Sequence, residues 1–319
     1  MYLTKKLFSE VFEIPYDEGY RNLQILSGYV SPAFVEFILS RFEDLILDIT
    51  VGMISNEGIS ISHHHAFLNL SRKYKERINI YYQIESPGNH RKVYYWMEND
   101  FLDLPPKLFL GSANFSYNGF FRQKELLIEA TFDNINDIFE DLQTMNCEDS
   151  LISSNIKMFN LVPRDKKANK ENKSFPQKVI SIENQGDLEY VDISLLAKGE
   201  TPKTSGINWG QREGRDKNQA YLAVPLSIHK KYPDFFPAKA EPFLMLTDDG
   251  QSMICVMAQQ NRKAIHTTEN NSILGAYLRK RLGVPDKAFV HTEDLINYGK
   301  DFVRIYKIDA ETYYMDFSV

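Results

Sequence analysis

The sequence has few cysteines and no long apolar segment. Its 319 residues include only two cysteines, Cys147 and Cys255, too few for a disulfide framework or a zinc site built from thiolates. It contains no run of eighteen apolar residues and no apolar segment typical of a signal peptide near its start. Neither a membrane span nor export is therefore predicted, and we expect a cytoplasmic protein.

The sequence also lacks internal repeats, low-complexity tracts and an excess of positive charge. The net charge is −6 at pH 7, which argues against indiscriminate binding to polyanions. Any affinity for nucleic acid must then come from a local basic surface. A hydrophobic content of 43% over 319 residues is enough for two ordinary cores, so two domains are expected.

A polar segment marks the boundary between these domains. Residues 163–173, with the sequence PRDKKANKENK, carry almost no apolar side chains and cannot offset their ordering entropy by burial. We predict domains at 1–160 and 188–319, joined by a polar, basic linker at 161–187. A linker that touches DNA phosphates is the alternative to a solvated spacer, which is favoured.

Before the linker, strands and helices alternate as in an α/β sheet. Residues 23–30, 45–54 and 78–84 are predicted strands, with helices after Ser31-Pro32, from about 64 to 75, and after Asp133. The triplet 63–65, three histidines, invites a metal site. Consecutive helical residues point about 100° apart, however, so an ordinary helix start is favoured. The fold class predicted for this half is a mixed α/β sheet with flanking helices.

Five residues of the first half suggest phosphodiester chemistry. His90 and Lys92 stand two apart on a predicted alternating strand and so share one face. A second strand runs into a turn that carries Ser112 and Asn114, and a third brings Glu125. A histidine nucleophile, a lysine for phosphate charge, polar donors and a carboxylate that orients the histidine form a phosphodiesterase set without a metal. The alternative is that His90 is a half-buried structural histidine.

After the linker, short β-rich segments dominate. Asp248-Asp249-Gly250 supplies a tight hairpin turn, and two helices are expected, at 272–282 before Gly283 and from Thr292 to near Gly299. The seven predicted strands are 191–196, 220–226, 242–247, 252–258, 263–267, 302–308 and 312–317. Seven short strands with few helices predict a mainly-β barrel.

Two polar loops on this barrel carry side chains suited to reading bases. Arginine suits guanine, glutamine and asparagine suit adenine, and lysine suits phosphate. The alternative is two ordinary surface loops. The candidate DNA contacts are Asn208, Trp209, Gln211, Arg212, Arg215 and Lys217 in one loop, and Gln259, Asn261, Arg262 and Lys263 in the other.

The pattern His90-x-Lys92 followed by Gly111-Ser112-x-Asn114 resembles the signature of the phospholipase D superfamily. It departs from that family at Met97, where many members carry an aspartate. The whole chain resembles the NgoFVII-type restriction endonucleases, in which a phospholipase-D-like nuclease precedes a DNA-binding pseudobarrel of the plant B-three type. The segments that carry this second resemblance are 205–212, 247–250, 270–275 and 279–284.

The resemblance implies a type II-like restriction endonuclease that cuts double-stranded DNA at specific sequences with no cofactor and no metal ion. Cleavage would pass through a phosphohistidine at His90. A cognate DNA methyltransferase would protect the same sites, and some relatives work with a separate helicase-like ATPase subunit. Because His90-x-Lys92 is the one copy of the motif that is completed by a following Gly-Ser-x-Asn, a homodimer with a composite active site is expected. The alternatives are a non-catalytic DNA-binding regulator and a phospholipase-D-type phosphodiesterase that acts on another substrate.

Overall fold

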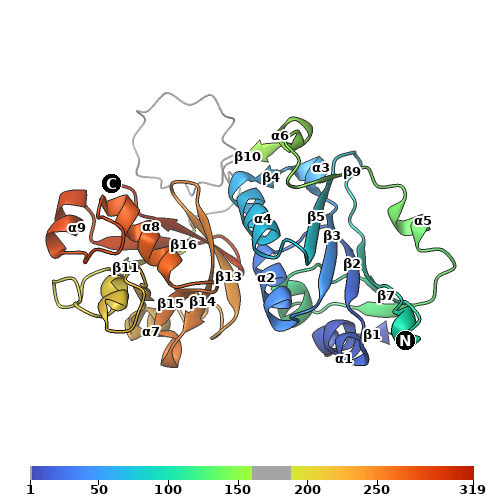
Figure 1. The fold of residues 1–319 in the computed structure, drawn as a ribbon, viewed down its shortest axis with the longest axis horizontal. Coiled ribbons are helices and arrows are strands. Elements are labelled where there is room, and N and C mark those ends of the chain that lie inside the picture. The colour runs from blue at the N-terminus through green and yellow to red at the C-terminus, as the bar shows by residue number, and fades with distance from the viewer. Residues whose placement is uncertain (1, 160–187) are drawn as a thin grey trace. The chain divides into compact units, whose positions relative to one another are not determined.

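A computed structural model describes residues 2–159 and 188–319, which form an N-terminal and a C-terminal unit (Figure 1). The predicted linker at 161–187 lies outside the described residues, and its limits stay predictions. No helix in the described part of the chain is long and apolar enough to cross a membrane.

The N-terminal unit is built on an eight-stranded mixed sheet in the order β1-β8-β7-β6-β2-β3-β5-β9. Strands β2, β3 and β5 run parallel, and β6, β7 and β8 continue the sheet antiparallel. A separate short pair joins β4 to β10. The strands are β1 (Tyr2–Leu3), β2 (Asn22–Ser27), β3 (Ile46–Val51), β4 (Ile59–Ser60), β5 (Ile78–Gln83), β6 (Lys92–Trp96), β7 (Lys107–Gly111), β8 (Leu127–Ala130), β9 (Thr144–Asn146) and β10 (Met158–Phe159).

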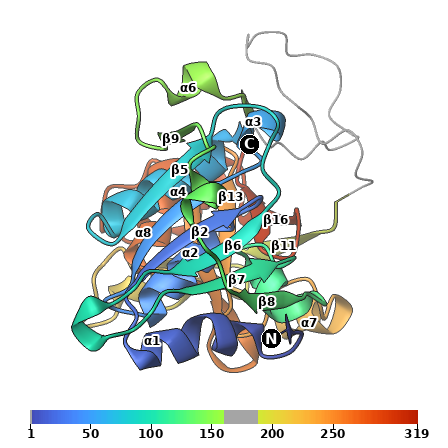
Figure 2. The same ribbon diagram turned by 90° about the vertical axis from the view of Figure 1, so that its right-hand side faces the viewer.

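Helices cover both faces of this sheet. Helices α2 and α4 lie against one face (Figures 1 and 2), and residues around α5 pack on the other face against Leu26, Val93, Tyr95 and Leu108. Every residue of β6 is buried, as expected for a strand covered on both sides. The helices are α1 (Ile14–Glu18), α2 (Pro32–Arg41), α3 (Ile54–Glu57), α4 (Ile61–Lys73), α5 (Asn136–Phe139) and α6 (Ile152–Asn155), with short turns at Ser9–Glu13, Asp100–Leu102 and Asn118–Arg122.

Two predicted helix starts have different outcomes. The Ser31 hydroxyl accepts from the Phe34 amide at 3.3 Å at the start of α2, which confirms that prediction. The predicted cap at Asp133 is wrong, because the side chain of Asn134 accepts from the Asn136 amide at 3.1 Å instead. Helix α5 is also a single turn, shorter than predicted.

The histidine triplet lies at the start of helix α4, as predicted. The helix itself begins at Ile61, three residues before the predicted start. Ser60 caps the helix by accepting from the His63 amide at 3.1 Å. His64 is buried, with Nδ1 3.1 Å from the Tyr82 hydroxyl, and burial lowers the pKa of His64 to about 4. Within the two described ranges, no group of three His, Cys, Asp or Glu residues could hold a metal ion.

The C-terminal unit is a seven-stranded sheet in the order β11-β16-β17-β13-β14-β15-β12. The two end strands, β11 and β12, also contact each other, so the sheet curls into the expected pseudobarrel. All seven predicted strands are present, and two have the predicted limits. They are β11 (Tyr190–Ser194), β12 (Leu222–Ala223), β13 (Pro242–Thr247), β14 (Ser252–Ala258), β15 (Ala264–Thr267), β16 (Phe302–Lys307) and β17 (Thr312–Asp316).

The helices of this unit include one that we did not predict. Helices α8 (Ser272–Leu282) and α9 (Thr292–Tyr298) match the prediction and end at Gly283 and Gly299, both left-handed. The segment expected to be a strand over 220–226 pairs for only two residues and then turns into α7 (Leu226–Lys231). Pro225 ends the strand because it lacks an amide donor, and it stands directly before α7.

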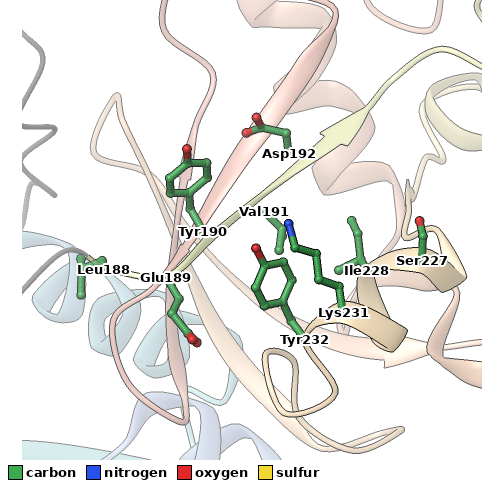
Figure 3. Close-up of a pocket in the computed structure, with 9 residues that line it drawn as sticks. All are labelled: Leu188, Glu189, Tyr190, Val191, Asp192, Ser227, Ile228, Lys231 and Tyr232. Atoms are coloured by element: carbon green, nitrogen blue, oxygen red, sulfur yellow. The ribbon is translucent and has the colours of Figure 1, made fainter.

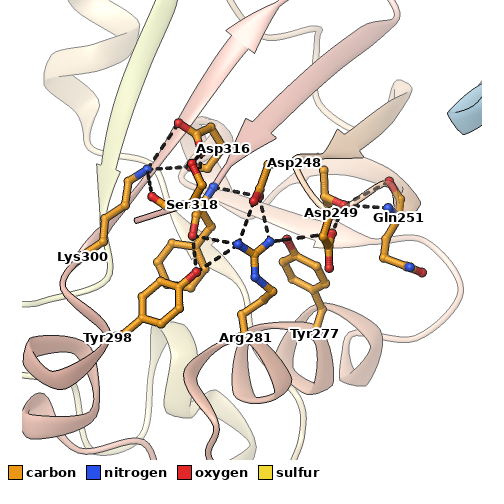
Figure 4. Close-up of polar contacts among 11 residues, drawn as sticks. Asp248, Asp249, Gln251, Tyr277, Arg281, Tyr298, Lys300, Asp316 and Ser318 are labelled. Carbon is orange, nitrogen blue, oxygen red and sulfur yellow. Dashed lines mark hydrogen bonds and ion pairs between the residues drawn. The ribbon is translucent and has the colours of Figure 1, made fainter. Parts of the chain in front are cut away.

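An arginine on α8 ties together three elements of the C-terminal unit (Figure 4). The Arg281 guanidinium donates to both carboxylate oxygens of Asp248 at 2.8 and 2.7 Å. It also donates to the hydroxyls of Tyr277 and Tyr298 and to the carbonyl of Phe317, at 2.9 to 3.0 Å. Because both charges are largely buried, with side chains 15% and 11% exposed, either one left alone would be costly.

We predict that Asp248→Asn destabilises the C-terminal unit by about 3 kcal/mol, since it removes the carboxylate that pairs with a largely buried guanidinium through two hydrogen bonds. Hydrogen exchange measured by mass spectrometry on peptides from β13 and α8 checks this, with β2 and β3 peptides as the internal reference. The matched control is Asp249→Asn: Asp249 lies 3.7 Å from Arg281 and is 34% exposed, so about 1 kcal/mol or less is expected. Equal losses in both variants would contradict the assignment.

Candidate functional site

His90 and Lys92 meet at one edge of the N-terminal sheet. Lys92 is the first residue of β6, whereas His90 lies in the loop before it rather than within the strand as predicted. Lys92 Nζ lies 2.8 Å from His90 Nδ1 and donates to the His90 carbonyl at 2.6 Å. His90 is exposed and Lys92 only 5% exposed. The pair therefore presents a reachable imidazole with a lysine ammonium fixed beneath it.

The electrostatics of Lys92 reflect two opposing effects. Burial lowers the pKa of Lys92, and the negative charge of Glu125 acts in the opposite direction.

Asn114 joins the same edge through the end of β2. Its Oδ1 accepts from the Tyr29 amide at 3.3 Å and lies 3.4 Å from the Ser27 hydroxyl. Ser27 pairs with Lys92 in the β2–β6 ladder, so Asn114 and Lys92 belong to one site. With its oxygen engaged in these contacts, the side-chain NH₂ of Asn114 is left to donate to a ligand.

Ser112 and Glu125 contact each other. The Ser112 hydroxyl donates to Glu125 Oε2 and accepts from the Leu126 amide at 3.0 Å. Gly111 is required here because a Cβ would stand 2.0 Å from the Leu126 carbonyl oxygen. Glu125 precedes β8 instead of starting it. Its hydrogen bond within the described residues is to Ser112, so its predicted role in orienting His90 stays a prediction.

The departure at Met97 lies outside this site. Met97 packs against Leu26, Val93, Tyr95 and Leu108. Strand residues alternate between faces, and these partners lie on the face of the sheet opposite Lys92. Met97 therefore does not remove a group from the cluster around His90.

A second His-x-Lys triplet, His229-Lys230-Lys231, lies in α7 of the C-terminal unit, outside any Gly-Ser-x-Asn context. His229 Nε2 lies 2.8 Å from the Arg262 carbonyl oxygen, so this ring is committed to a loop contact. The His90 copy is the one that stands with the other site residues.

Two residues at the candidate active site were not predicted from the sequence. Ser27 was inside a predicted strand, and its place at the carboxyl end of that strand was the available signal. Tyr29 follows it, with its ring 5.8 Å from the His90 ring at 81°. Neither stands near His90 in the sequence, so spacing did not reveal them.

In the C-terminal unit, the first polar loop contains an organised cation. The Arg215 guanidinium lies 4.0 Å above the Trp209 ring and donates to the side-chain oxygen of Gln219 at 3.0 Å. Trp209 packs in turn against Tyr221 and His266, with ring centroids 5.4 and 5.2 Å away. His266 and Tyr221 therefore support the ring on which Arg215 stacks. Six of the predicted DNA contacts are exposed: Arg212, Arg215, Lys217, Gln259, Asn261 and Lys263.

Two predicted DNA contacts serve the loops themselves. Asn208 is fully buried, and its amide exchanges bonds with the Val290 backbone at 2.8 and 3.0 Å. Arg262 donates to the carbonyls of Phe236 and Pro237 at 3.0 and 3.2 Å. We therefore remove Asn208 and Arg262 from the set, because their polar groups are already paired within the protein.

The two remaining predicted contacts, Gln211 and Trp209, are partly buried. The Gln211 amide donates to the carbonyls of Lys217 and Lys287 at 3.1 and 3.2 Å, which leaves its oxygen as an acceptor.

A separate pocket of about 490 Å³ lies between β11 and α7, where Tyr190, Lys231 and Tyr232 point into it (Figure 3). None of the predicted contacts lines that pocket.

Comparisons with solved structures give only weak matches. A polyphosphate kinase from Porphyromonas gingivalis is 9% identical over 41% of this chain and 19% of its own length, with a TM-score of 0.28. A hypothetical Arabidopsis thaliana protein is 15% identical over 41% of this chain and 92% of its own, with a TM-score of 0.20. The chain thus spans 19% of the kinase's length. TM-scores this low do not support an inference about the function of this chain. No curated protein matches the chain.

Family models give a clear result for both halves. The model of the NgoFVII restriction endonuclease N-terminal PLD domain matches residues 5–158. The model of the NgoFVII C-terminal B3-like DNA-binding domain matches residues 183–309. Together the two matches cover nearly the whole chain in the order expected from the sequence, and the chain belongs to the NgoFVII restriction endonuclease family.

Proposed function

We propose that this protein is a restriction endonuclease that cuts double-stranded DNA at specific sequences without a metal ion. The observation that carries the proposal is the grouping of His90, Lys92 and Asn114 at one sheet edge, in a chain whose second half belongs to a DNA-binding family. A reachable imidazole beside a buried ammonium and a free amide donor suits attack on a phosphodiester.

The proposed reaction has two steps. A ring nitrogen of His90 attacks phosphorus, a phosphorus–nitrogen bond forms, and the bond to the leaving sugar oxygen breaks as that oxygen takes a proton. Water then attacks the phosphohistidine while the group that protonated the leaving oxygen takes the water's proton, the phosphorus–nitrogen bond breaks, and both groups are restored. Lys92 and the Asn114 amide donate to the non-bridging oxygens as their charge grows. These donors supply the charge stabilisation that a metal ion provides in other nucleases.

Ser112 and Glu125 complete the set. In the resting site the hydroxyl of Ser112 donates to Glu125, and the charge of Glu125 favours the protonated form of Lys92. We propose that Ser112 turns toward the phosphate when it binds, and that Glu125 keeps Lys92 charged and orients the imidazole. Both groups lie on the turn and loop next to β7 and β8.

The leaving oxygen needs a proton, and the His-x-Lys motif that stands with Gly-Ser-x-Asn supplies one histidine, because His229 is committed to a loop contact in the C-terminal unit. We propose a homodimer in which the second histidine comes from the partner, so that one His90 attacks while the other protonates the leaving group. A cognate DNA methyltransferase, and in some settings a separate helicase-like ATPase subunit, remain proposed partners drawn from the family resemblance.

We expect His90→Ala to lower cleavage of supercoiled plasmid by about 10³-fold or more while leaving DNA binding intact, because the nucleophile is lost. Reactions run in EDTA should match those without it for the wild-type protein. His65→Ala, exposed on α4, is the control and should cut normally. Retained cleavage by His90→Ala, or loss of wild-type cleavage in EDTA, would refute the chemistry.

The composite site makes a quantitative prediction. If each site needs two copies of His90, mixing wild-type protein with His90→Ala at constant total concentration should lower activity as the square of the wild-type fraction. Mixing with His65→Ala should leave activity unchanged. Cleavage rates measured after full subunit exchange check this, and a linear dependence on the wild-type fraction would show that one chain acts alone.

Recognition should depend on the exposed loop residues and not on the buried ones. In full-length His90→Ala protein, adding Arg212→Ala or Arg215→Ala should cost ~1–3 kcal/mol of discrimination at one base pair. Changing Lys217 or Lys263 should weaken binding to all duplexes alike and flatten the salt dependence. Asn208→Ala, the matched control, should lower thermal stability, because the Val290 backbone groups lose their partners. Binding titrations against matched and mismatched duplexes, with melting curves, separate these effects, and unchanged preference in both arginine variants would contradict the assignment.

A further inference from the structure

Tyr29 connects three parts of the candidate active site. Its backbone amide donates to Asn114 Oδ1 at 3.3 Å, its ring stands edge-on to the His90 ring with centroids 5.8 Å apart, and its hydroxyl donates to Glu57 Oε1 at 2.7 Å. It belongs to the loop that follows β2, while Glu57 ends α3. The ring is 43% exposed, so these contacts, and not burial in the core, fix its position.

His90 needs such a support because its own backbone gives little. It is exposed and stands in a loop, so its ring can rotate unless its neighbours restrain it. Lys92 restrains the nitrogen side. On the other side the ring packs against the Gly28 backbone, where a Cβ would stand 3.2 Å from His90 Cδ2. The ring of Tyr29 is the remaining described contact in the resting site, where Glu125 accepts a hydrogen bond from Ser112.

Glu57 fixes the hydroxyl end of Tyr29. The carboxylate accepts a hydrogen bond from the phenol hydroxyl and raises the pKa of Tyr29 to about 12, so the phenol stays neutral at ordinary pH. A neutral ring anchored at both its backbone and its hydroxyl has few other orientations available.

We propose that Tyr29 is a positioning residue for His90, held in place by Glu57. The inference rests on the proposed function, because it assigns to Tyr29 the restraint of the attacking imidazole. Tyr29 itself transfers no proton and binds no phosphate. A misaligned nucleophile slows attack by about 10- to 100-fold without weakening substrate binding, and this separates positioning from a role in holding DNA.

The test compares three variants of the full-length protein under single-turnover conditions at saturating cognate DNA. Tyr29→Leu removes the aromatic contact and should slow cleavage by about 10- to 100-fold, with unchanged Kd and melting temperature. Tyr29→Phe keeps the ring and should restore the rate to within about threefold of wild type. Glu57→Gln, which keeps an acceptor for the hydroxyl, should stay closer to the wild-type rate than Tyr29→Phe, which loses that hydrogen bond. Tyr81→Leu, at a half-buried position on β5, controls for loss of an aromatic ring.

Each outcome decides the proposal. Wild-type cleavage by Tyr29→Leu, in a series where His90→Ala is inactive, would overturn the role of Tyr29 and leave the proposed function standing. A raised Kd with an unchanged single-turnover rate would mean that Tyr29 holds DNA, which also overturns positioning. Cleavage by His90→Ala would overturn both, because no attacking imidazole would then exist to be positioned.

Discussion

The arrangement of the candidate active site depends on one buried hydroxyl at the end of β2. Ser27, fully buried, accepts from the Phe115 amide at 3.0 Å and donates to the Tyr29 carbonyl at 2.7 Å. It also pairs with Lys92 across the β2–β6 ladder. One hydroxyl therefore fixes the turn that carries Asn114 relative to the strand that carries Lys92. Because an unpaired buried polar group is costly, these segments have little freedom to separate, and the site is preorganised before any phosphate arrives.

The sequence predicts contacts of the site between residues that are close in the chain, but not contacts between residues that are far apart. His90 and Lys92 stand two apart, so the short chain between them keeps them close even though His90 lies in the loop before β6. The Ser27–Phe115 contact joins residues 88 positions apart. No sequence pattern around either residue predicts that contact. The same limit explains Glu125. Its strand was recognised, but the choice between His90 and Ser112 as its partner depends on where two loops end in space, which periodicity does not specify.

The basic residues of the C-terminal unit show a second limit of prediction. Arg262 was predicted to face DNA, yet Asn261 and Arg262 both have positive φ, 59° and 55°, and the turn directs the guanidinium back onto backbone carbonyls. Arg279, 1% exposed, likewise donates to the carbonyls of Ala288 and Gly275. Composition identifies a polar loop, but it does not distinguish an arginine that faces solvent from one that stabilises the loop. For Arg262, the direction of the guanidinium depends on left-handed backbone angles at two consecutive residues that are not glycine, and the sequence patterns of common turns do not predict such angles.

The resting contacts of the active site also suggest why chemistry and recognition occupy separate domains. Lys92 already lies against His90 and its carbonyl, and Ser112 already donates to Glu125. In the proposed enzyme a phosphate would have to displace these internal partners before attack, so phosphate contacts alone would yield little net binding at this edge. Phosphate contacts also carry no sequence information. The exposed loops of the C-terminal unit would then supply the binding free energy needed to replace the internal partners by a phosphate. They would supply it only when bound to the recognition sequence. Binding energy from groups remote from the reacting phosphorus would then be used to assemble the transition state, which couples cutting to recognition without any base contact at His90.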